Sequence, residues 1–86
     1  MMTHASHQSI IPRLKRAEGH LRSVIGMIEA GKPCLDLAQQ LHAVEAAIAK
    51  AKKELIQDHI EHCLEDGQGP DVKAVLHEIK QLAKYL

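Results

Sequence analysis

An all-α fold with one long central helix is predicted by three features of the sequence. Apolar residues recur at alternating intervals of four and three along most of the chain, which is the spacing of amphipathic helices. No segment alternates apolar and polar residues as a half-buried strand does. Two groups of helix-ending residues, Gly31-Lys32-Pro33 and Gly67-Gln68-Gly69-Pro70, divide the 86 residues into three helical segments within a single domain, residues 1–86.

The first predicted helix begins near Ser9 and ends at Gly31. Pro12 would then lie in the first turn, where its missing N–H costs no helical hydrogen bond. Residues 1–8 are polar and are expected to be flexible. The apolar residues of this segment form a seam suited to another helix: Ile10, Leu14, Ala17, Leu21, Val24 and Ile28.

The second predicted helix runs from about Pro33 to Glu65 without an internal Gly or Pro. At a rise of about 1.5 Å per residue it would be about 48 Å long, which is more than the rest of the chain can cover. A lone copy of so small a domain would bury too little apolar surface, so we expect an oligomer. The apolar positions of this helix are Leu37, Leu41, Val44, Ile48, Ala51 and Leu55.

A third amphipathic helix is predicted from Asp71, a suitable N-cap residue, to the C-terminus. The protomer is therefore expected to contain three helices, of which the second is by far the longest. The apolar face of the third helix is formed by Val72, Val75, Leu76, Ile79, Leu82, Ala83 and Leu86.

The long helix carries a pair of candidate metal ligands near its end. His59 and Cys63 are four residues apart, so an imidazole and a thiol project from one face of the helix. The only other cysteine, Cys34, lies roughly 37 Å away along the same helix and cannot reach them within one molecule. The same separation rules out an intrachain disulfide, which needs Cα atoms within about 7 Å. Without the distant cysteine, the alternative is a core histidine beside a small buried thiol.

An antiparallel pair of long helices would bring the three residues together between two molecules. With a two-fold axis near Ala47 and Ile48, Cys34 of one chain lies beside His59 and Cys63 of the other, and symmetry forms this site twice. The expected assembly is an antiparallel dimer that forms a four-helix bundle. The residues near the axis are small enough for two backbones to approach closely: Ala43, Ala46, Ala47, Ala49 and Ala51.

The donor set indicates which metal ions would bind. Two thiolates and one imidazole favour Cu(I) and could also hold Zn(II). Ni(II) or Co(II) would require further donors, for which His4 and His7 are candidates. His62 lies about 100° around the helix from Cys63, so we expect it to face solvent or to support the site. The other histidines have no partner at ligand spacing and are expected on the surface or in packing contacts: His20, His42 and His77.

The charged residues are balanced in number but unevenly distributed. Eleven basic and eleven acidic side chains cancel, which by itself argues against a nucleic-acid-binding protein. There is no helix-turn-helix signature, and basic clusters are often only the solvated sides of amphipathic helices. A neutral chain can nevertheless present a basic face to DNA. The candidate DNA-binding residues are Arg13, Lys15, Arg16 and Arg22 in the first helix and Lys50, Lys52 and Lys53 in the second.

Other function classes find no support in the sequence. No apolar run approaches the roughly 20 residues of a membrane span, and the N-terminus lacks a secretion signal. We therefore expect a cytoplasmic protein, without membrane contact, whose cysteines are reduced. There is no Gly-rich phosphate loop, so no organic cofactor is expected. Neither cysteine has an oriented base beside it, so the sequence does not predict an enzyme.

Four segments of the chain form a recognisable pattern. They are Arg13-Leu14-Lys15-Arg16-Ala17-Glu18-Gly19-His20, Cys34-Leu35-Asp36, Gln39-Gln40-Leu41-His42-Ala43-Val44 and Asp58-His59-Ile60-Glu61-His62-Cys63. Together they resemble the CsoR/RcnR/FrmR family of small all-helical bacterial repressors, most closely its copper-sensing members. The resemblance covers nearly the whole chain, and a cysteine followed later by His-x-x-x-Cys is specific to it.

The resemblance implies a homotetramer, a dimer of antiparallel dimers, that binds operator DNA and releases it when its inducer binds. Copper-sensing members of this family use residues that match Cys34, His59 and Cys63, with the first cysteine supplied by the neighbouring subunit. Arg13 and Lys50 match family positions that contact DNA. The remaining residues of the two basic groups would widen that face.

The resemblance also has departures, which leave other inducers open. Copper sensors commonly carry a tyrosine before the first cysteine, where this chain has Pro33. His4 and His7 are similar to the N-terminal histidine of nickel and cobalt sensors. Formaldehyde sensors usually lack a counterpart of Cys63, and persulfide sensors typically lack one of His59. The alternatives are therefore a Ni(II)- or Co(II)-sensing repressor, a persulfide- or formaldehyde-responsive repressor, or a copper storage or chaperone bundle without DNA affinity.

Overall fold

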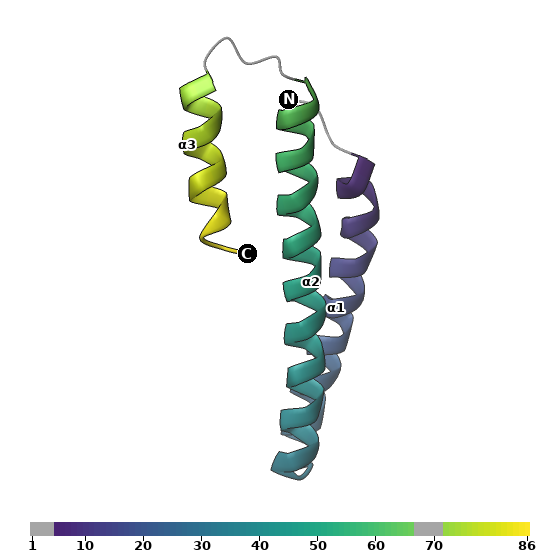
Figure 1. Cartoon of the computed structure of the whole chain (residues 1–86). Helices are drawn as coiled ribbons and strands as arrows, with labels where there is room; N and C mark the ends of the chain where they lie inside the picture. The colour runs from purple at the N-terminus through teal and green to yellow at the C-terminus, as the bar shows by residue number, and fades with distance from the viewer. Residues whose placement is uncertain (1–4, 67–71) are drawn as a thin grey trace.

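The protein folds into three helices, α1 (Ala5–Glu29), α2 (Cys34–Asp66) and α3 (Val72–Ala83) (Figure 1). The structure is a computed structural model that describes the backbone of residues 5–66 and 72–86 and the side chains of residues 7–62 and 72–86. Within these residues there is no strand. α1 and α2 lie antiparallel and side by side, and α3 runs back along the half of α2 that is nearer its C-terminal end. The predicted all-α protomer with a long central helix is confirmed.

The start of α1 differs from the prediction. The helix begins at Ala5 instead of near Ser9, so Pro12 lies inside the helix and not in its first turn. Pro12 cannot donate to the carbonyl of Gln8, one turn earlier, but both residues are exposed, so water can satisfy that carbonyl. Helical geometry does not report mobility, so the flexibility of residues 1–8 stays a prediction.

The turn between α1 and α2 follows from one glycine. Gly31 has a φ of +73°, a conformation that residues with a Cβ rarely adopt. Beyond it, the N–H of Lys32 donates to the carbonyl of Met27 at 3.1 Å, which caps the end of α1. The Pro33 carbonyl then accepts the first helical bond of α2, from the N–H of Leu37 at 3.1 Å. The predicted end of the first helix and start of the second are confirmed.

The core of the protomer is a single seam between α1 and α2. On α1 it consists of Ile10, Ala17 and Val24, at intervals of seven residues, and each is at most 6% exposed. Val44, Ala51 and Ile56 of α2 complete it, at 2–3% exposure. Val24, on the buried side of α1, is fully enclosed. Burial of these aliphatic side chains is what holds the hairpin together.

A second apolar stripe on each helix is left open. Leu41, Ile48 and Leu55 of α2 are also seven residues apart, but they are 37–44% exposed. Their counterparts on α1, Leu14, Leu21 and Ile28, are 39–53% exposed. Each apolar seam predicted from the sequence is therefore buried along one stripe of residues and exposed along the other within one protomer. Apolar stripes of this spacing are suited to packing against further helices.

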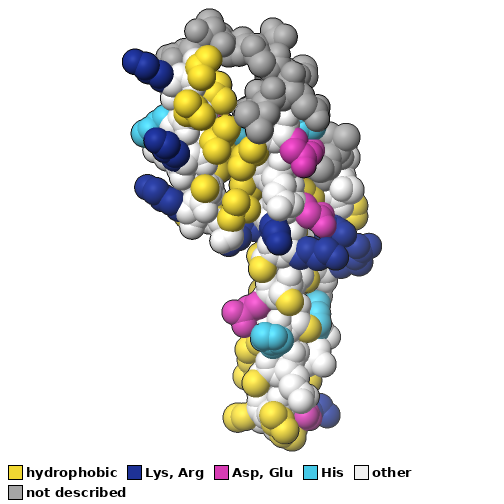
Figure 2. All heavy atoms as spheres, viewed as in Figure 1, with side chains coloured by type: hydrophobic (Ala, Val, Ile, Leu, Met, Phe, Trp, Pro, Cys, Tyr) yellow, Lys and Arg dark blue, Asp and Glu magenta, His cyan; other side chains and the backbone are white. Residues whose placement is uncertain are grey.

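α3 is the least covered part of the protomer, since none of its residues is buried. Val75, Ile79 and Leu82 are half-buried beside α2, whereas Val72 and Leu76 are 67% and 50% exposed. The space-filling view shows hydrophobic side chains gathered along the junction of α3 and α2 (Figure 2). The helix ends at Ala83 rather than at the terminus, because the last residues form turns with bonds from residue i to i−3. Asp71 lies outside the described residues, as does the predicted break at Gly67-Gln68-Gly69-Pro70.

The molecule is a single layer of helices. Its extents are 56 × 23 × 14 Å, so it is elongated and thin. A layer this thin has no second side to enclose its apolar stripes. The predicted antiparallel dimer and dimer of dimers would cover them, and both stay predictions for a single chain.

Candidate metal centre and basic groove

Cys34 is the first residue of α2 and lies at the tip of the α1–α2 hairpin. Its thiol is free and exposed. Among the described side chains, no group of three His, Cys, Asp or Glu residues is placed to hold a metal ion within one protomer. The backbone of Cys63 belongs to α2, but its side chain lies outside the described residues. The predicted ligation by Cys34, His59 and Cys63 therefore remains a prediction.

His59 is already oriented by a carboxylate. Its Nε2 is hydrogen-bonded to Oε1 of Glu78 on α3, and the imidazole is 34% exposed. A neutral imidazole in this pair donates its Nε2–H to the carboxylate of Glu78. Metal-bound histidines almost always donate their other N–H in this manner, which fixes the ring and increases its basicity. The contact with Glu78 is thus of the kind that accompanies metal binding by a histidine.

Glu78 is a functional candidate that sequence reasoning missed. It lies three residues after Val75 and four before Leu82, both of which face α2. An acidic residue beside the apolar face of an amphipathic helix is the signal that could have identified it, because a carboxylate near a helix interface requires a partner. Nothing in the local spacing indicates that its partner is His59, which is nineteen residues away.

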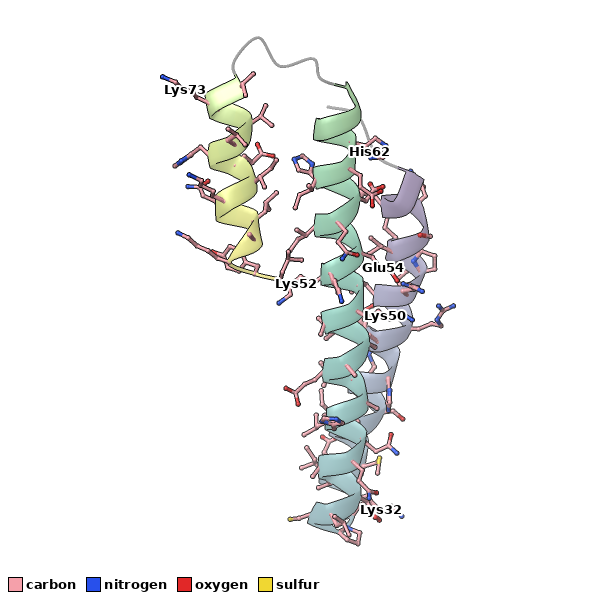
Figure 3. The ribbon with its side chains drawn as sticks, in the orientation of Figure 1. Lys32, Lys50, Lys52, Glu54, His62 and Lys73 are labelled. Carbon is pink, nitrogen blue, oxygen red and sulfur yellow. The ribbon has the colours of Figure 1, made fainter. Side chains whose placement is uncertain are left out.

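His62 is bonded within its own helix. Its Nδ1 lies 2.9 Å from the backbone carbonyl of Asp58 and 3.4 Å from the Asp58 carboxylate, so Nδ1 carries the proton. The side chain leaves α2 on the side that faces α1 (Figure 3). This geometry suits the supporting role predicted from the sequence, and a role as an additional ligand stays untested.

His7 is brought close to His59, although fifty-two residues separate them. Both line an apolar cavity of about 260 Å³ between the three helices, together with Leu55, Glu78 and Leu82. His7 is half-buried in the early turns of α1. His4, the other predicted extra donor, lies outside the described residues. Of the two N-terminal histidines, His7 is therefore the one that the described structure places near the candidate centre.

Part of the predicted basic face forms a groove between α1 and α2. Arg13 and Arg16 from α1 and Lys50 from α2 line a cavity of about 270 Å³, with His20 beside them and Ala17 and Ala47 as small neighbours. Lys and Arg side chains gather where the middle of α2 meets α1 (Figure 2). These cations come from segments more than thirty residues apart in the sequence. Cations that converge on one opening are the arrangement expected of a phosphate-binding surface.

The other predicted DNA-binding residues do not line this groove. Lys52 leaves α2 on the side opposite Lys50 (Figure 3), as expected for residues about 200° apart around a helix. Lys15 borders a shallow apolar depression with Ile11 instead. The remaining two predicted residues, Arg22 and Lys53, are exposed on their helices. The seven predicted residues therefore do not form one continuous face on a protomer.

An ion pair crosses the edge of the groove. The Arg13 guanidinium is paired with the carboxylate of Glu54 on α2, and both side chains are 36% exposed. The hydrogen bond from Arg13, its charge and that of Lys50 lower the pKa of Glu54, and the same bond raises the pKa of Arg13. Both groups are consequently ionised at neutral pH. Nearby, His20 Nε2 lies 2.6 Å from Oε1 of Gln40.

A search for membrane spans among the described residues finds no helix long and apolar enough to cross a bilayer.

Comparisons with known proteins place these features in context. A family model described as metal-sensitive transcriptional repressor matches residues 6–86. The copper-sensing transcriptional repressor CsoR of Bacillus subtilis (strain 168) is 40% identical over 57 residues, which cover 66% of this chain and 56% of that protein. The copper-sensing transcriptional repressor RicR of Mycobacterium tuberculosis (strain ATCC 25618 / H37Rv) is 38% identical over 66 residues, covering 71% of this chain and 69% of RicR. The match thus spans just over half of the Bacillus protein.

A solved structure gives a similar result at the level of the fold. The structure titled as the nickel-responsive transcriptional regulator InrS superposes with a TM-score of 0.83 at 27% sequence identity, and covers 100% of this chain and 99% of that one. The proteins of similar sequence are thus described as copper-sensing and the structural neighbour as nickel-responsive.

Proposed function

This chain belongs to the family of metal-sensitive transcriptional repressors, and we propose that within this family it is a Cu(I)-responsive repressor that releases operator DNA when the metal binds. The family membership confirms the resemblance read from the four sequence segments, and it identifies a regulator rather than an enzyme. The observation that carries the copper proposal is the contact between His59 and Glu78, one turn before Cys63 on α2, because metal-bound histidines almost always donate their other N–H to such a group. A cytoplasmic location is part of the same proposal.

The proposed site is shared between two subunits. Cys34 of one chain would join His59 and Cys63 of the other, since the length of α2 keeps Cys34 roughly 37 Å from His59 within a chain. The open stripe on α2 supports this pairing, because it is centred on Ile48 and reaches Cys34 after two intervals of seven residues. Two antiparallel copies of α2 that bury this stripe would place each Cys34 level with the other chain's His59–Cys63 segment.

The groove supplies the proposed contact with DNA. Arg13, Arg16 and Lys50 would hold phosphates, and a dimer of dimers would present several copies of this groove along the duplex. Binding of this kind depends mainly on charge, so it should weaken steeply as salt increases. Lys15, Arg22, Lys52 and Lys53 would contribute through other subunits of the tetramer, or through the general field of the protein.

Metal binding would oppose DNA binding through the shape of the assembly. A site formed by opposite ends of two α2 helices ties these ends together and favours one arrangement of the subunits. The proposal is that this arrangement moves the basic grooves out of register with the phosphates. A coupling of about 1–3 kcal/mol would weaken DNA binding by roughly 5–150-fold.

The experiment measures the affinity of the full chain for an operator duplex with and without one equivalent of Cu(I) per subunit. The duplex is first selected from random-sequence DNA by binding to the apo protein. Fluorescence anisotropy of the labelled duplex should show weaker binding in the presence of Cu(I). Equal affinities in the two conditions would end the copper proposal.

A second candidate inducer is Ni(II) or Co(II). The position of His7, beside His59 in the same cavity, is the observation that favours it, since these ions require further nitrogen or oxygen donors. Absorption spectra separate the two candidates, because Ni(II) and Co(II) complexes are coloured, whereas Cu(I) gives only an ultraviolet thiolate band.

A further inference from the structure

The ion pair at the edge of the basic groove joins a predicted DNA-binding residue, Arg13, to a carboxylate, Glu54, that the proposed function does not use. We propose that Glu54 competes with DNA: its carboxylate occupies the Arg13 guanidinium in the DNA-free protein, and a DNA phosphate must displace it. The inference rests on the proposed function, since it requires that the groove binds DNA. It assigns to Glu54 the task of limiting affinity for the nucleic acid backbone.

The pair lies where a phosphate would have to enter. Arg13 lines the groove with Arg16 and Lys50, and Glu54 reaches Arg13 from the neighbouring helix, forty-one residues away in the sequence. Figure 3 shows Glu54 and Lys50 on the side of α2 that faces α1. Both members of the pair are 36% exposed, so a phosphate group can reach the guanidinium from solvent.

The chemistry of the guanidinium makes the two anions alternatives. Its planar fork of N–H donors matches a carboxylate and a phosphate in the same manner. The structure gives one contact, from Nη1 of Arg13 to Oε2 of Glu54, so the N–H that makes this contact is not available to a phosphate while the pair is formed. An exposed pair of this kind contributes little to stability, so the exchange is readily reversible. Glu54 therefore lowers the affinity in a graded manner instead of blocking the groove.

Lys50 extends the effect of Glu54 to a second cation of the groove. Lys50 precedes Glu54 by four residues, so the two side chains are neighbours on α2. The charge of Lys50 contributes to the lowered pKa of Glu54, which reports the same proximity. One carboxylate thus lies near two of the three cations that line the groove.

Exchange of the Glu54 carboxylate for a DNA phosphate should change the salt dependence of DNA binding. Each phosphate that a free cation neutralises releases counterions and adds about 0.9 to the slope of log K against log salt. If a phosphate displaces Glu54, the released carboxylate attracts cations from the solution, which cancels much of this gain. Removal of the carboxylate should restore it.

The test compares the apo full-length protein with its Glu54→Gln variant on the selected operator duplex, between about 50 and 200 mM salt. Glu54→Gln keeps the shape of the side chain and removes its charge. We expect binding to be about 3–10-fold tighter at low salt, with a slope steeper by up to about 0.9. Glu54→Ala should change affinity in the same direction. Circular dichroism establishes that both variants are folded.

Two further variants separate release of Arg13 from a general change in charge. Glu45→Gln removes an exposed carboxylate from the same helix, away from the residues that line the groove, and should change affinity less than about twofold. In an Arg13→Gln background, Glu54→Gln should lose most of its effect, because there is no guanidinium to release.

Three outcomes would overturn the inference while the proposed function stands. They are unchanged or weaker binding by Glu54→Gln, an equal gain from Glu45→Gln, and a full gain in the Arg13→Gln background. Absence of DNA binding by the unmodified protein at every salt concentration would overturn the proposed function, and this inference with it.

Discussion

The two ends of α2 differ in what surrounds their candidate ligands. At the N-terminal end, Cys34 is exposed at the hairpin tip. At the C-terminal end, His59 is bonded to Glu78 and shares a cavity with His7, and His62 is bonded within the helix. The N-terminal end thus presents a single exposed thiol, whereas the C-terminal end presents a histidine that is held by a carboxylate. Completion of each end by the opposite end of another chain, as proposed above, would join these two kinds of donor.

The strongest test of this difference removes Cys34. Cys34→Ala should lower Cu(I) affinity by at least about 100-fold, because loss of a ligand costs more than the 10–100-fold loss of a supporting partner. Competition with a chelator of known Cu(I) affinity measures the change. His59→Ala should have a similar effect.

Mixing the two variants shows whether the site crosses the interface. In a dimer with one Cys34→Ala chain and one His59→Ala chain, one of the two sites has all its ligands. Random mixing should restore about a quarter of the Cu(I)–thiolate absorbance, since half of the dimers are mixed and each has one intact site. If mixing restores no absorbance, the site is not formed by Cys34 of one chain and His59 of another.

The support at the C-terminal end is tested by Glu78→Gln. The variant keeps the shape of the side chain but removes the negative charge that accepts the Nε2–H of His59. We expect Cu(I) affinity, or the DNA response to Cu(I), to fall by about 10–100-fold. Glu45→Gln, a loss of charge elsewhere on α2, serves as the control. Unchanged Cu(I) affinity and an unchanged DNA response in Glu78→Gln would mean that Glu78 does not assist metal binding by His59.

The turn that presents the N-terminal end is tested by Gly31→Ala. Gly31 has a φ of +73° and open space within 4 Å of an added Cβ, so the cost is conformational and not steric. The free energy of unfolding should decrease by about 1 kcal/mol.

Gly26→Ala is the matched control for this turn. Gly26 lies inside α1, again with open space around an added Cβ, so alanine should stabilise the helix by about 0.5–1 kcal/mol. Urea unfolding at one fixed protein concentration compares the two variants, because the stability of an oligomer depends on its concentration. If both substitutions change stability in the same direction, the turn does not require the glycine.

The smallest effect is expected for His7→Ala. Two thiolates and an imidazole complete a low-coordinate Cu(I) site, so the copper response should change less than about threefold. Titration of the DNA complex with Cu(I) and, separately, with Ni(II) gives the comparison. If His7→Ala instead abolishes the DNA response to metal, the nickel or cobalt sensor is favoured. His7 of α1 would then supply a nitrogen donor beside His59.

The helices were predictable because their signals are local. Gly31 and the long apolar repeat of α2 place the end of α1 and both ends of α2 within two residues of their observed positions. The start of α1 was not predictable from Pro12, since an exposed proline can be tolerated inside a helix. Which apolar residues are covered also depends on packing, as Leu14 and Ala17 illustrate: the same predicted seam leaves the first 42% exposed and the second 6% exposed.

For the site, the sequence predicts candidate ligands, and these stay predictions. The spacing of His59 and Cys63 indicates chemistry directly, because residues four apart share a helix face. Glu78 and Glu54 were missed because each acts on a residue of another helix, and no local pattern reports such a contact. For the same reason, the sequence grouped Lys52 with Lys50, although the two leave α2 on opposite sides.

The 14 Å thickness of the protomer has a consequence for how the protein behaves in a cell. A newly synthesised chain has no second layer to shield its aliphatic stripes, so before it meets another copy it is a target for proteases and chaperones. Its abundance would then set its own lifetime, and scarce copies would be removed sooner than plentiful ones.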